Sequence, residues 1–237
     1  MGRELLPLLT EAGYPIAALI EREGHPLLGR TLTAEAGLPP LTTLAETPRV
    51  EGAMVVDFSL PAAMDDLLAF CLKNGYPLLS GTTGLTPDQH IRLQETGETI
   101  PLLWAPNFSL GVAVLRRLAG EAARLLGSDY SIHLIETHHA AKKDAPSGTA
   151  LLLVEALHQA GGEPTVQSMR GGTVPGTHEL HFLGPGESLE FTHRAEGRTL
   201  FARGAVRALG WLSSQPPGRY RMEDTLIPPD SEGSAKP

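Results

Sequence analysis

The strongest constraint on the fold is an alternation of short apolar segments and amphipathic segments across the first half of the chain. Short apolar runs bounded by turn residues are typical of buried strands, and the segments between them have helical spacing. Because strands covered on both faces are apolar throughout, this order predicts an α/β fold, a parallel sheet with helices on both faces. The expected helices are residues 3–12, 61–73 and 87–95, and the expected strands are residues 16–20, 53–58, 77–80 and 100–104.

The second half has a different pattern. Two segments of alternating polarity flank Gly184-Pro185-Gly186 and predict a β-hairpin, so this region is at least partly antiparallel and its class is α+β. We expect a last helix, residues 198–212, to return to the first domain, which gives domains of residues 1–109 with 199–237 and of residues 110–198. The other expected elements are a helix over residues 110–126, a strand over 131–136, a helix over about 148–160, and hairpin strands over 178–183 and 188–193.

Composition limits the classes of function. The 237 residues are 41% hydrophobic and 19% charged, which predicts a folded protein with a real core. A formal net charge of −8 argues against a nucleic-acid partner, because such proteins are usually basic. The single cysteine, Cys71, suits a reducing cytoplasm and is expected in the core. No apolar run approaches the ~20 residues of a membrane span, and residues 227–237 are expected to be a solvated tail.

Polar segments follow three of the expected strands. Glu21-Arg22, Gly81-Thr82-Thr83-Gly84 and Ala105-Pro106-Asn107-Phe108-Ser109 each come directly after an apolar run. Ligands of doubly wound sheets bind beyond the carboxyl ends of the strands, so the three segments predict one binding edge. An acid about 20 residues after a glycine turn is typical of a contact with adenosine ribose, which fits Glu21, and Arg22 could meet a 2′-phosphate. Taken singly, each segment is also compatible with a plain solvated turn.

The start of the sequence departs from the Rossmann pattern. That pattern opens with a strand and a Gly-x-Gly-x-x-Gly turn, whereas here a helix is expected at residue 3 with only Gly2 ahead of it. The first strand and most of the pyrophosphate-binding turn are therefore missing from the expected fold. We hypothesise that Met1 is an internal start and that roughly 15 to 20 residues, one strand and its turn, lie upstream.

The segment over residues 136–149 carries the strongest chemical signal. It places His138, His139 and Lys142 ahead of Ser147-Gly148-Thr149, between an expected strand and an expected helix. Histidine exchanges protons near neutral pH, lysine supplies a positive charge, and the amides at a helix start bind anions. The segment therefore predicts a pocket for a small acidic molecule in which a proton is moved.

Other chemistry fits this segment less well. Adjacent histidines on an extended segment point in opposite directions and lack the helical spacing of zinc ligands, and no acid or cysteine stands at metal-ligand spacing nearby. Ser147 lacks the Gly-x-Ser-x-Gly turn of a serine hydrolase. A metal-dependent hydrolase that uses His133, His138 and His139 remains as a separate hypothesis.

Taken together, these motifs resemble the 4-hydroxy-tetrahydrodipicolinate reductase family, also called dihydrodipicolinate reductases, of bacterial lysine and diaminopimelate biosynthesis. The likeness extends to about Leu226 and rests on a motif that is highly specific to the family, Glu136-x-His138-His139-x-x-Lys142-x-Asp144-Ala145-Pro146-Ser147-Gly148-Thr149. Four further motifs follow the family's order: Gly81-Thr82-Thr83-Gly84, Asn107-Phe108-Ser109, Val174-Pro175-Gly176-Thr177 and Phe201-Ala202-x-Gly204-Ala205. Residues 170–178 have the composition of a mobile loop that could close over a ligand, and Gly204 is expected to let the last helix pack closely.

The resemblance implies an oxidoreductase that transfers hydride from NADH or NADPH to a small cyclic dicarboxylate, with loss of water. It implies a nucleotide-binding domain from both chain ends and a central domain that builds a homotetramer. From the spacing of the histidines, no metal ion is expected. The implied catalytic acid/base is His138 and the proton donor Lys142, while His139, Gly148 and Thr149 hold substrate carboxylates. The implied cofactor residues are Met1, Glu21, Arg22, Gly81, Thr82, Thr83, Ala105, Pro106, Asn107 and Phe108. A truncated, non-catalytic homologue that keeps carboxylate binding and assembly is the alternative.

Overall fold

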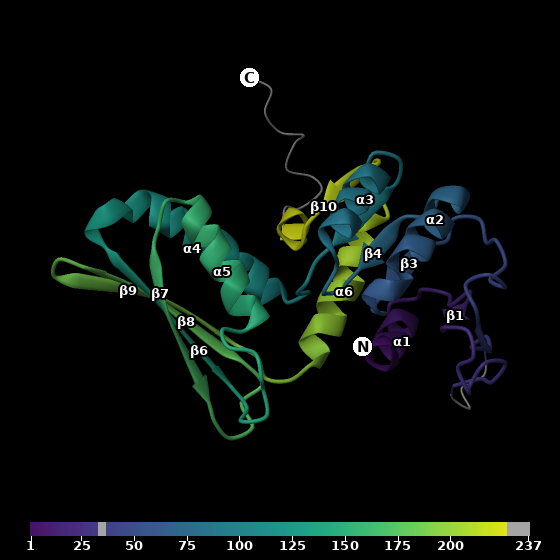
Figure 1. Ribbon diagram of the computed structural model, residues 1–237, viewed down its shortest axis with the longest axis horizontal. Helices are drawn as coiled ribbons and strands as arrows, with labels where there is room; N and C mark the ends of the chain where they lie inside the picture. Colours follow the sequence, from purple (N-terminus) through teal and green to yellow (C-terminus); the bar gives the residue numbers. More distant parts are fainter. Residues whose placement is uncertain (33–36, 227–237) are drawn as a thin grey trace. The chain divides into compact units, whose positions relative to one another are not determined.

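The computed structural model describes residues 1–32 and 37–226, which form two compact units (Figure 1). The first unit comprises Met1–Ala105 and Ala205–Arg221, and the second comprises Pro106–Gly204 and the segment that starts at Met222. This last segment, which the sequence places with the first domain, forms the 3-10 helix η3 (Met222–Leu226) in the second unit, where Glu223 pairs with Arg116 at 2.9 Å. The tail predicted at residues 227–237 lies outside the described residues. None of the described helices is long and apolar enough to span a membrane.

The first unit is built on parallel strands, as predicted. The strand order in its larger sheet is β10 (Gly218–Tyr220), β5 (Pro101–Trp104), β4 (Leu78–Ser80) and β3 (Val55–Asp57), with every neighbouring pair parallel. A second parallel sheet consists of β1 (Leu19–Ile20) and β2 (Leu41–Thr42). Among the described residues no strand joins β1 to β3, and the first element is a helix, α1 (Gly2–Glu11). The opening strand of a Rossmann unit is thus absent from this part of the chain.

Local signals set the ends of the helices in the first unit. α3 (Pro87–Gly97) begins after Thr86, whose hydroxyl accepts the N–H of Gln89 at 3.2 Å in a capping box. The 3-10 turn η1 (Pro61–Ala63) leads into α2 (Met64–Asn74), which ends at Gly75 with a φ of 70°. Both helices contribute to a core over β4 and β5 that includes Cys71, fully buried as predicted. Burial, and after it Asp57, raises the pKa of the Cys71 thiol to about 12, so it is an inert core residue.

The second unit is a mixed sheet with two helices on one face (Figure 1). The strand order is β7 (Pro164–Arg170), β6 (Ser131–His138), β8 (Thr177–Gly184) and β9 (Glu187–Arg194). β6 pairs in parallel with β7 and antiparallel with β8, and β8 pairs antiparallel with β9, which confirms the predicted hairpin. The 3-10 turn η2 (Gly127–Asp129) precedes β6. The core that α4 (Leu110–Leu126) and α5 (Gly148–Gln159) share with this sheet includes Ile132, Leu134, Leu180 and Phe182.

Three strands were not predicted. β2 and β10 have two and three residues, too few for a recognisable apolar run. β7 has seven residues but only Val166 and Met169 among them are large and apolar, so its pairing with β6 has no local signal. β7 takes up Arg170 and β8 takes up Thr177 and His178, so the loop predicted over residues 170–178 is shorter than expected.

A close helix contact explains one glycine motif. In α6 (Thr199–Leu212), a Cβ added to Gly204 would lie 1.7 Å from the carbonyl oxygen of Phe108. No side chain fits at that separation, so glycine is required there. The structural interpretation of Phe201-Ala202-Arg203-Gly204-Ala205 is therefore confirmed.

Candidate active site

Strand alternation in β6 brings two functional side chains into the interior. Ile132 and Leu134 point into the core beneath the helices, and residues two and four further along point to the same face. Those residues are Glu136, which is fully buried, and His138, which is 7% exposed. The strand that builds the core therefore also carries a carboxylate and an imidazole to the end of that core, beside the start of α5.

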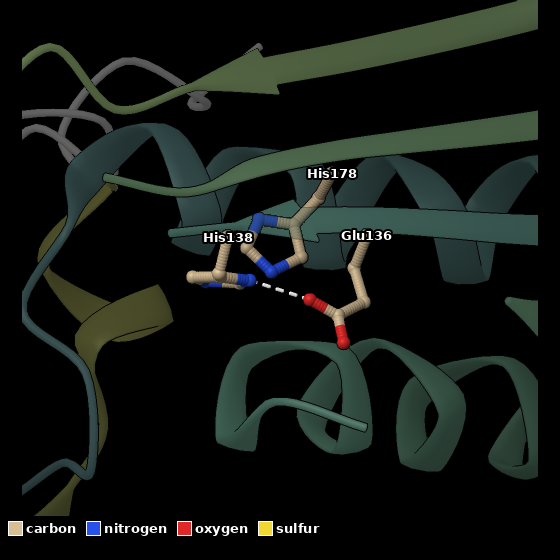
Figure 2. A group of neighbouring side chains, drawn as sticks. All are labelled: Glu136, His138 and His178. Carbon is tan, nitrogen blue, oxygen red and sulfur yellow. Dashed lines mark hydrogen bonds and ion pairs between the residues drawn. The ribbon is translucent and has the colours of Figure 1, made fainter. Parts of the chain in front are cut away.

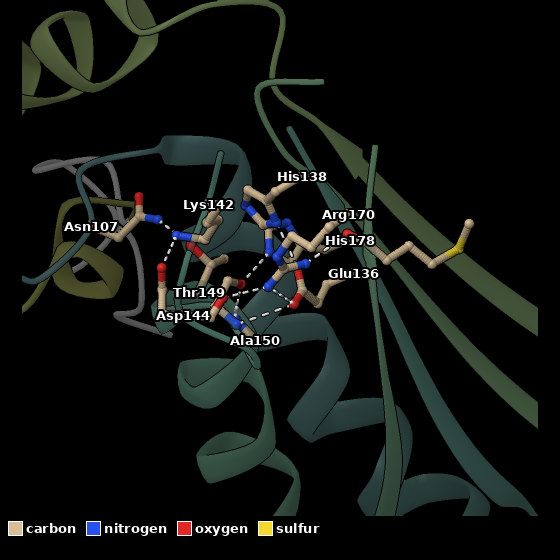
Figure 3. Close-up of polar contacts among 11 residues, drawn as sticks. Asn107, Glu136, His138, Lys142, Asp144, Thr149, Ala150, Arg170 and His178 are labelled. Atoms are coloured by element: carbon tan, nitrogen blue, oxygen red, sulfur yellow. Dashed lines mark hydrogen bonds and ion pairs between the residues drawn. The ribbon is translucent and has the colours of Figure 1, made fainter. Parts of the chain in front are cut away.

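Glu136 is the centre of the polar contacts (Figures 2 and 3). Its Oε2 lies 2.5 Å from Nδ1 of His138. Its Oε1 accepts from Nη2 of Arg170 at 2.7 Å and from the backbone N–H of Ser147 at 3.3 Å. The carboxylate thus joins the ends of β6 and β7 to the turn before α5.

The charge states around Glu136 are set by competition between burial and hydrogen bonding. Burial by itself raises the pKa of Glu136, but hydrogen bonds from Arg170, Ser168 and His138 lower it to about 2. For His138, burial lowers the pKa and Glu136 acts in the opposite direction by favouring the imidazolium. Glu136 is therefore ionised at neutral pH and accepts the Nδ1 proton of His138, which leaves Nε2 of His138 to exchange a proton.

The glycine-containing loop after β7 lies against His138. The N–H of Gly171 donates to the carbonyl of His138 at 2.9 Å, and the carbonyl of Gly176 accepts from the N–H of Ala195 at 2.8 Å, so backbone hydrogen bonds anchor both ends of this loop. A Cβ added to Gly176 would lie 2.9 Å from Nε2 of His138. Glycine at this position therefore lets the loop pack against His138 without displacing its ring.

The start of α5 is organised by its cap. The hydroxyl of Ser147 accepts the N–H of Ala150 at 3.1 Å, the geometry of an N-cap, and Gly148 and Thr149 form the first helical turn. Nδ2 of Asn107 donates to Oγ1 of Thr149 at 2.8 Å. Two of the predicted substrate residues therefore sit at a helix N-terminus, where backbone amides favour an anion.

Lys142 lies on the segment between His138 and this helix. Its Nζ pairs with the Asp144 carboxylate at 2.9 Å, and the carbonyl of Asp144 accepts from Arg170 at 2.5 Å (Figure 3). His139 follows the strand directly and is half-buried. The predicted residues of the motif thus surround one end of β6, with Lys142 as a partly exposed cation.

His178, which sequence reasoning missed, completes the buried group. It lies on β8 opposite Glu136, and its Nε2 is 3.1 Å from Oγ of Ser147. Burial, followed by the charges of His138 and His193, lowers its pKa to about 4, so His178 is neutral at pH 7. Arg170 was missed as well, although it pairs in register with His138. Only the strand pairing shows that Arg170 and His178 lie near His138, because both are more than thirty positions after it in the sequence.

The expectation that no acid stands near the histidines at metal-ligand spacing is wrong. Ligand atoms of Glu136, His138 and His178 all lie within 4.8 Å of one another (Figure 2). However, the guanidinium of Arg170 already pairs with Glu136, and a second cation would be repelled there. His133 alternates to the opposite face of β6 from His138, so the trio proposed for a metal-dependent hydrolase does not assemble.

The first unit places a second buried carboxylate next to a predicted cofactor segment. Oδ2 of Asp57, at the end of β3, accepts from the hydroxyls of Ser80 and Thr82, both at 2.7 Å. Nε1 of Trp104 donates to the carbonyl of Thr82 at 2.9 Å, and the N–H of Ala105 donates to the carbonyl of Ser80 at 3.1 Å. Gly81, Thr82 and Thr83 therefore form a fixed loop at the carboxyl ends of β3, β4 and β5.

The remaining predicted cofactor residues are spread over both units. Glu21 follows β1, and its Oε2 accepts the N–H of Arg22 at 3.0 Å. Met1 is the N-cap residue of α1, where its carbonyl accepts two backbone N–H groups. Pro106, Asn107 and Phe108 begin the second unit, with Phe108 buried and Pro106 exposed.

Comparison with known proteins identifies the family. The family model described as dihydrodipicolinate reductase, N-terminus, matches residues 1–108, and the model for the C-terminus of the same family matches residues 111–226. A 4-hydroxy-tetrahydrodipicolinate reductase of Stenotrophomonas maltophilia is 47% identical over 227 residues, covering 95% of this chain and 93% of the relative. One from Geotalea uraniireducens is 36% identical over 252 residues, covering 95% and 94%.

Solved structures support the same fold. Dihydrodipicolinate reductase from Paenisporosarcina sp. TG-14, solved with dipicolinate bound, has a TM-score of 0.80 at 20% identity and covers 95% of each chain. A myo-inositol dehydrogenase from Corynebacterium glutamicum has a TM-score of 0.59 at 14% identity, covering 94% of this chain and 88% of its own. These likenesses show the fold, while the sequence relatives and the two family models show the kinship: the chain belongs to the dihydrodipicolinate reductase family.

Proposed function

We propose that this chain reduces 4-hydroxy-tetrahydrodipicolinate to tetrahydrodipicolinate with loss of water, using NADH or NADPH, in lysine and diaminopimelate biosynthesis. The observation that carries the proposal is the buried pair of Glu136 and His138 beside a capped helix start and a lysine. That arrangement occurs in a chain that matches the family over nearly its whole length. It supplies what a dicarboxylate reductase needs, namely an anion site and a proton donor next to each other.

The substrate carboxylates bind at the start of α5. The amides of Gly148 and Thr149 and the hydroxyl of Thr149 would face the bound carboxylate there, and Lys142 and His139 would add positive charge or hydrogen bonds. Lys142 already holds one carboxylate, that of Asp144, so a substrate carboxylate would compete for the same ammonium group. This local positive charge attracts a carboxylate although the formal net charge of the whole chain is −8.

His138 and Lys142 carry the proton chemistry. Hydride addition leaves negative charge on the substrate, and a nearby acid must quench it. The imidazole of His138 has Nε2 for this purpose, because Nδ1 is held by Glu136. Binding of a dianion next to His138 favours its protonated form and so opposes the effect of burial on its pKa.

The first unit would hold the nicotinamide cofactor, which supplies the hydride when bound. The donor chemistry of this unit fits: the Glu21 carboxylate can accept from ribose hydroxyls, and the adjacent Arg22 can meet a 2′-phosphate. The loop of Gly81, Thr82 and Thr83, fixed by Asp57, would line the nicotinamide side together with Ala105 and residues 106–108. Met1 would lie near the pyrophosphate.

We infer a homotetramer assembled through the second unit. The face of its sheet that α4 and α5 leave uncovered carries half-exposed side chains such as Ile135, and Met169 and Leu183 are 57% and 43% exposed. Apolar side chains on an otherwise open sheet face are typical of an interface. Light scattering of the purified protein measures the assembly, and a monomer would contradict this inference.

The activity is tested with substrate generated from pyruvate and aspartate semialdehyde. The wild-type protein should oxidise NADPH or NADH only when this substrate is added. His138→Ala should lower kcat far more than cofactor affinity, and Lys142→Ala should lower kcat by roughly a hundredfold and also raise KM. A folded wild-type protein that binds dipicolinate without oxidising either cofactor would instead support the non-catalytic alternative.

A further inference from the structure

Ser147 connects the proton-transfer residues to the anion site. Its backbone N–H donates to Oε1 of Glu136, and its hydroxyl caps α5 by accepting the N–H of Ala150. The same hydroxyl lies 3.1 Å from Nε2 of His178. Three contacts from one residue thus determine where the first turn of α5 lies relative to β6 and β8.

The direction of the contact between Ser147 and His178 follows from counting donors. The serine oxygen already accepts the N–H of Ala150, so its own hydrogen is left to donate, and Nε2 of His178 is the acceptor in reach. This places the histidine proton on Nδ1, a buried atom that makes no hydrogen bond among the described residues. The opposite tautomer would leave both the serine hydrogen and Nδ1 unsatisfied, which costs more. His178 therefore acts as a neutral acceptor.

The neighbouring strand repeats this arrangement. Ser109 caps α4 by accepting the N–H of Val112 at 3.2 Å, and its hydroxyl lies 3.2 Å from Nε2 of His193. His193 pairs in register with His178, and the ring centroids lie 6.2 Å apart. At the start of each of the two helices over the sheet, a capping serine therefore has its hydroxyl within hydrogen-bond distance of a histidine on the sheet.

We propose that His178 is a positioning residue for substrate binding: by holding Ser147 it fixes the first turn of α5, whose amides take a substrate carboxylate. This positioning role rests on the proposed function, which identifies the carboxylate as that of the substrate. The side chain is 3% exposed and lies on β8 beneath the helix, so it does not reach a ligand directly. Its contribution is to the affinity for the dicarboxylate and not to the proton step, which belongs to His138 and Lys142.

The test compares two substitutions of His178. His178→Leu removes the acceptor, whereas His178→Gln keeps an acceptor oxygen close to the position of Nε2 and can restore the contact. For His178→Leu we expect the dipicolinate Kd and the substrate KM to rise about tenfold, with kcat within about threefold of wild type, because a displaced helix start weakens anion binding. His178→Gln should recover most of this affinity. Ser147→Ala should resemble His178→Leu.

His158→Leu is the control, since His158 is a half-exposed histidine at the other end of α5. It should leave both constants unchanged. Dipicolinate binding is measured by calorimetry on the intact wild-type protein and on each variant, with circular dichroism to confirm folding.

Two results would overturn the positioning role. One is a folded His178→Leu or Ser147→Ala variant that binds dipicolinate as tightly as wild type. The other is a loss of affinity in His178→Gln as large as in His178→Leu. Because the Kd needs no turnover, a wild-type protein that binds dipicolinate but lacks reductase activity would refute the proposed function and still test His178.

Discussion

The two units each bury one carboxylate at the end of a strand, and the two carboxylates have different surroundings. Glu136 in the second unit contacts a guanidinium and an imidazole, both of which carry or exchange protons. Asp57 in the first unit accepts from two hydroxyls and from the backbone N–H of Ser59 at 2.9 Å. Two of the partners of Glu136, Arg170 and His138, are charged or titratable, while these partners of Asp57 are neutral. This difference indicates that Glu136 controls protonation and that Asp57 controls the shape of a loop.

The largest expected effect is that of Glu136→Gln. The substitution keeps the volume but removes the charge that orients His138 and balances Arg170, so we expect kcat to fall roughly a hundredfold and stability to fall by about 3 kcal/mol. Steady-state kinetics and denaturant unfolding measure the two effects. A variant with wild-type kcat would show that the contact with His138 has no part in the reaction.

Asp57→Asn should have a smaller and different effect. The amide keeps one acceptor oxygen but replaces the other with an NH2 group, which cannot accept a hydrogen bond. One oxygen of Asp57 accepts from Ser59 and the other from Thr82, so one of these contacts is lost and the loop of Gly81, Thr82 and Thr83 is distorted. We expect the KM for the nicotinamide cofactor to rise about tenfold while dipicolinate affinity stays unchanged, because we propose that the loop lines the cofactor side. Equal losses for both ligands would remove the distinction between the two carboxylates.

The pH dependence of stability should show the smallest effect, and it should come from the second unit. Burial lowers the pKa of His178 from 6.5 to about 4, so between these values the unfolded state binds the extra proton and stability rises with pH. Hydrogen bonds outweigh burial to lower the pKa of Glu136 from 4.5 to about 2, which adds stability that is lost as pH falls through that range. Unfolding measured from pH 7 downward should show both losses, and His178→Gln should flatten the first. A wild-type protein equally stable at pH 7 and pH 4 would contradict this.

Local sequence was enough to predict most of the fold. Serine and threonine caps with nearby proline or glycine mark helix ends, and the observed bounds of α4 match the predicted 110–126. The short apolar runs predicted β3, β4 and β5 to within a few residues. Strands without such runs, β7 above all, form because β6 offers them a partner, and that information is not local.

The candidate site divides in the same way. His138, Lys142, Gly148 and Thr149 share one continuous motif, so their proximity follows from the chain itself. Arg170 and His178 reach Glu136 only through the register of β7 and β8 on β6, which no spacing in the sequence indicates. Sequence motifs alone therefore could not predict that His178 and Arg170 lie next to Glu136.

The most direct test of the central claim is the pH profile of kcat/KM for wild type, Glu136→Gln and Asp57→Asn. If Glu136 sets the protonation of His138, removing its charge lowers the pKa of His138, and the loss of activity with rising pH shifts to lower pH in Glu136→Gln. Asp57→Asn should keep the wild-type profile with a reduced maximum. An unshifted profile in Glu136→Gln, or the same shift in Asp57→Asn, would contradict the account.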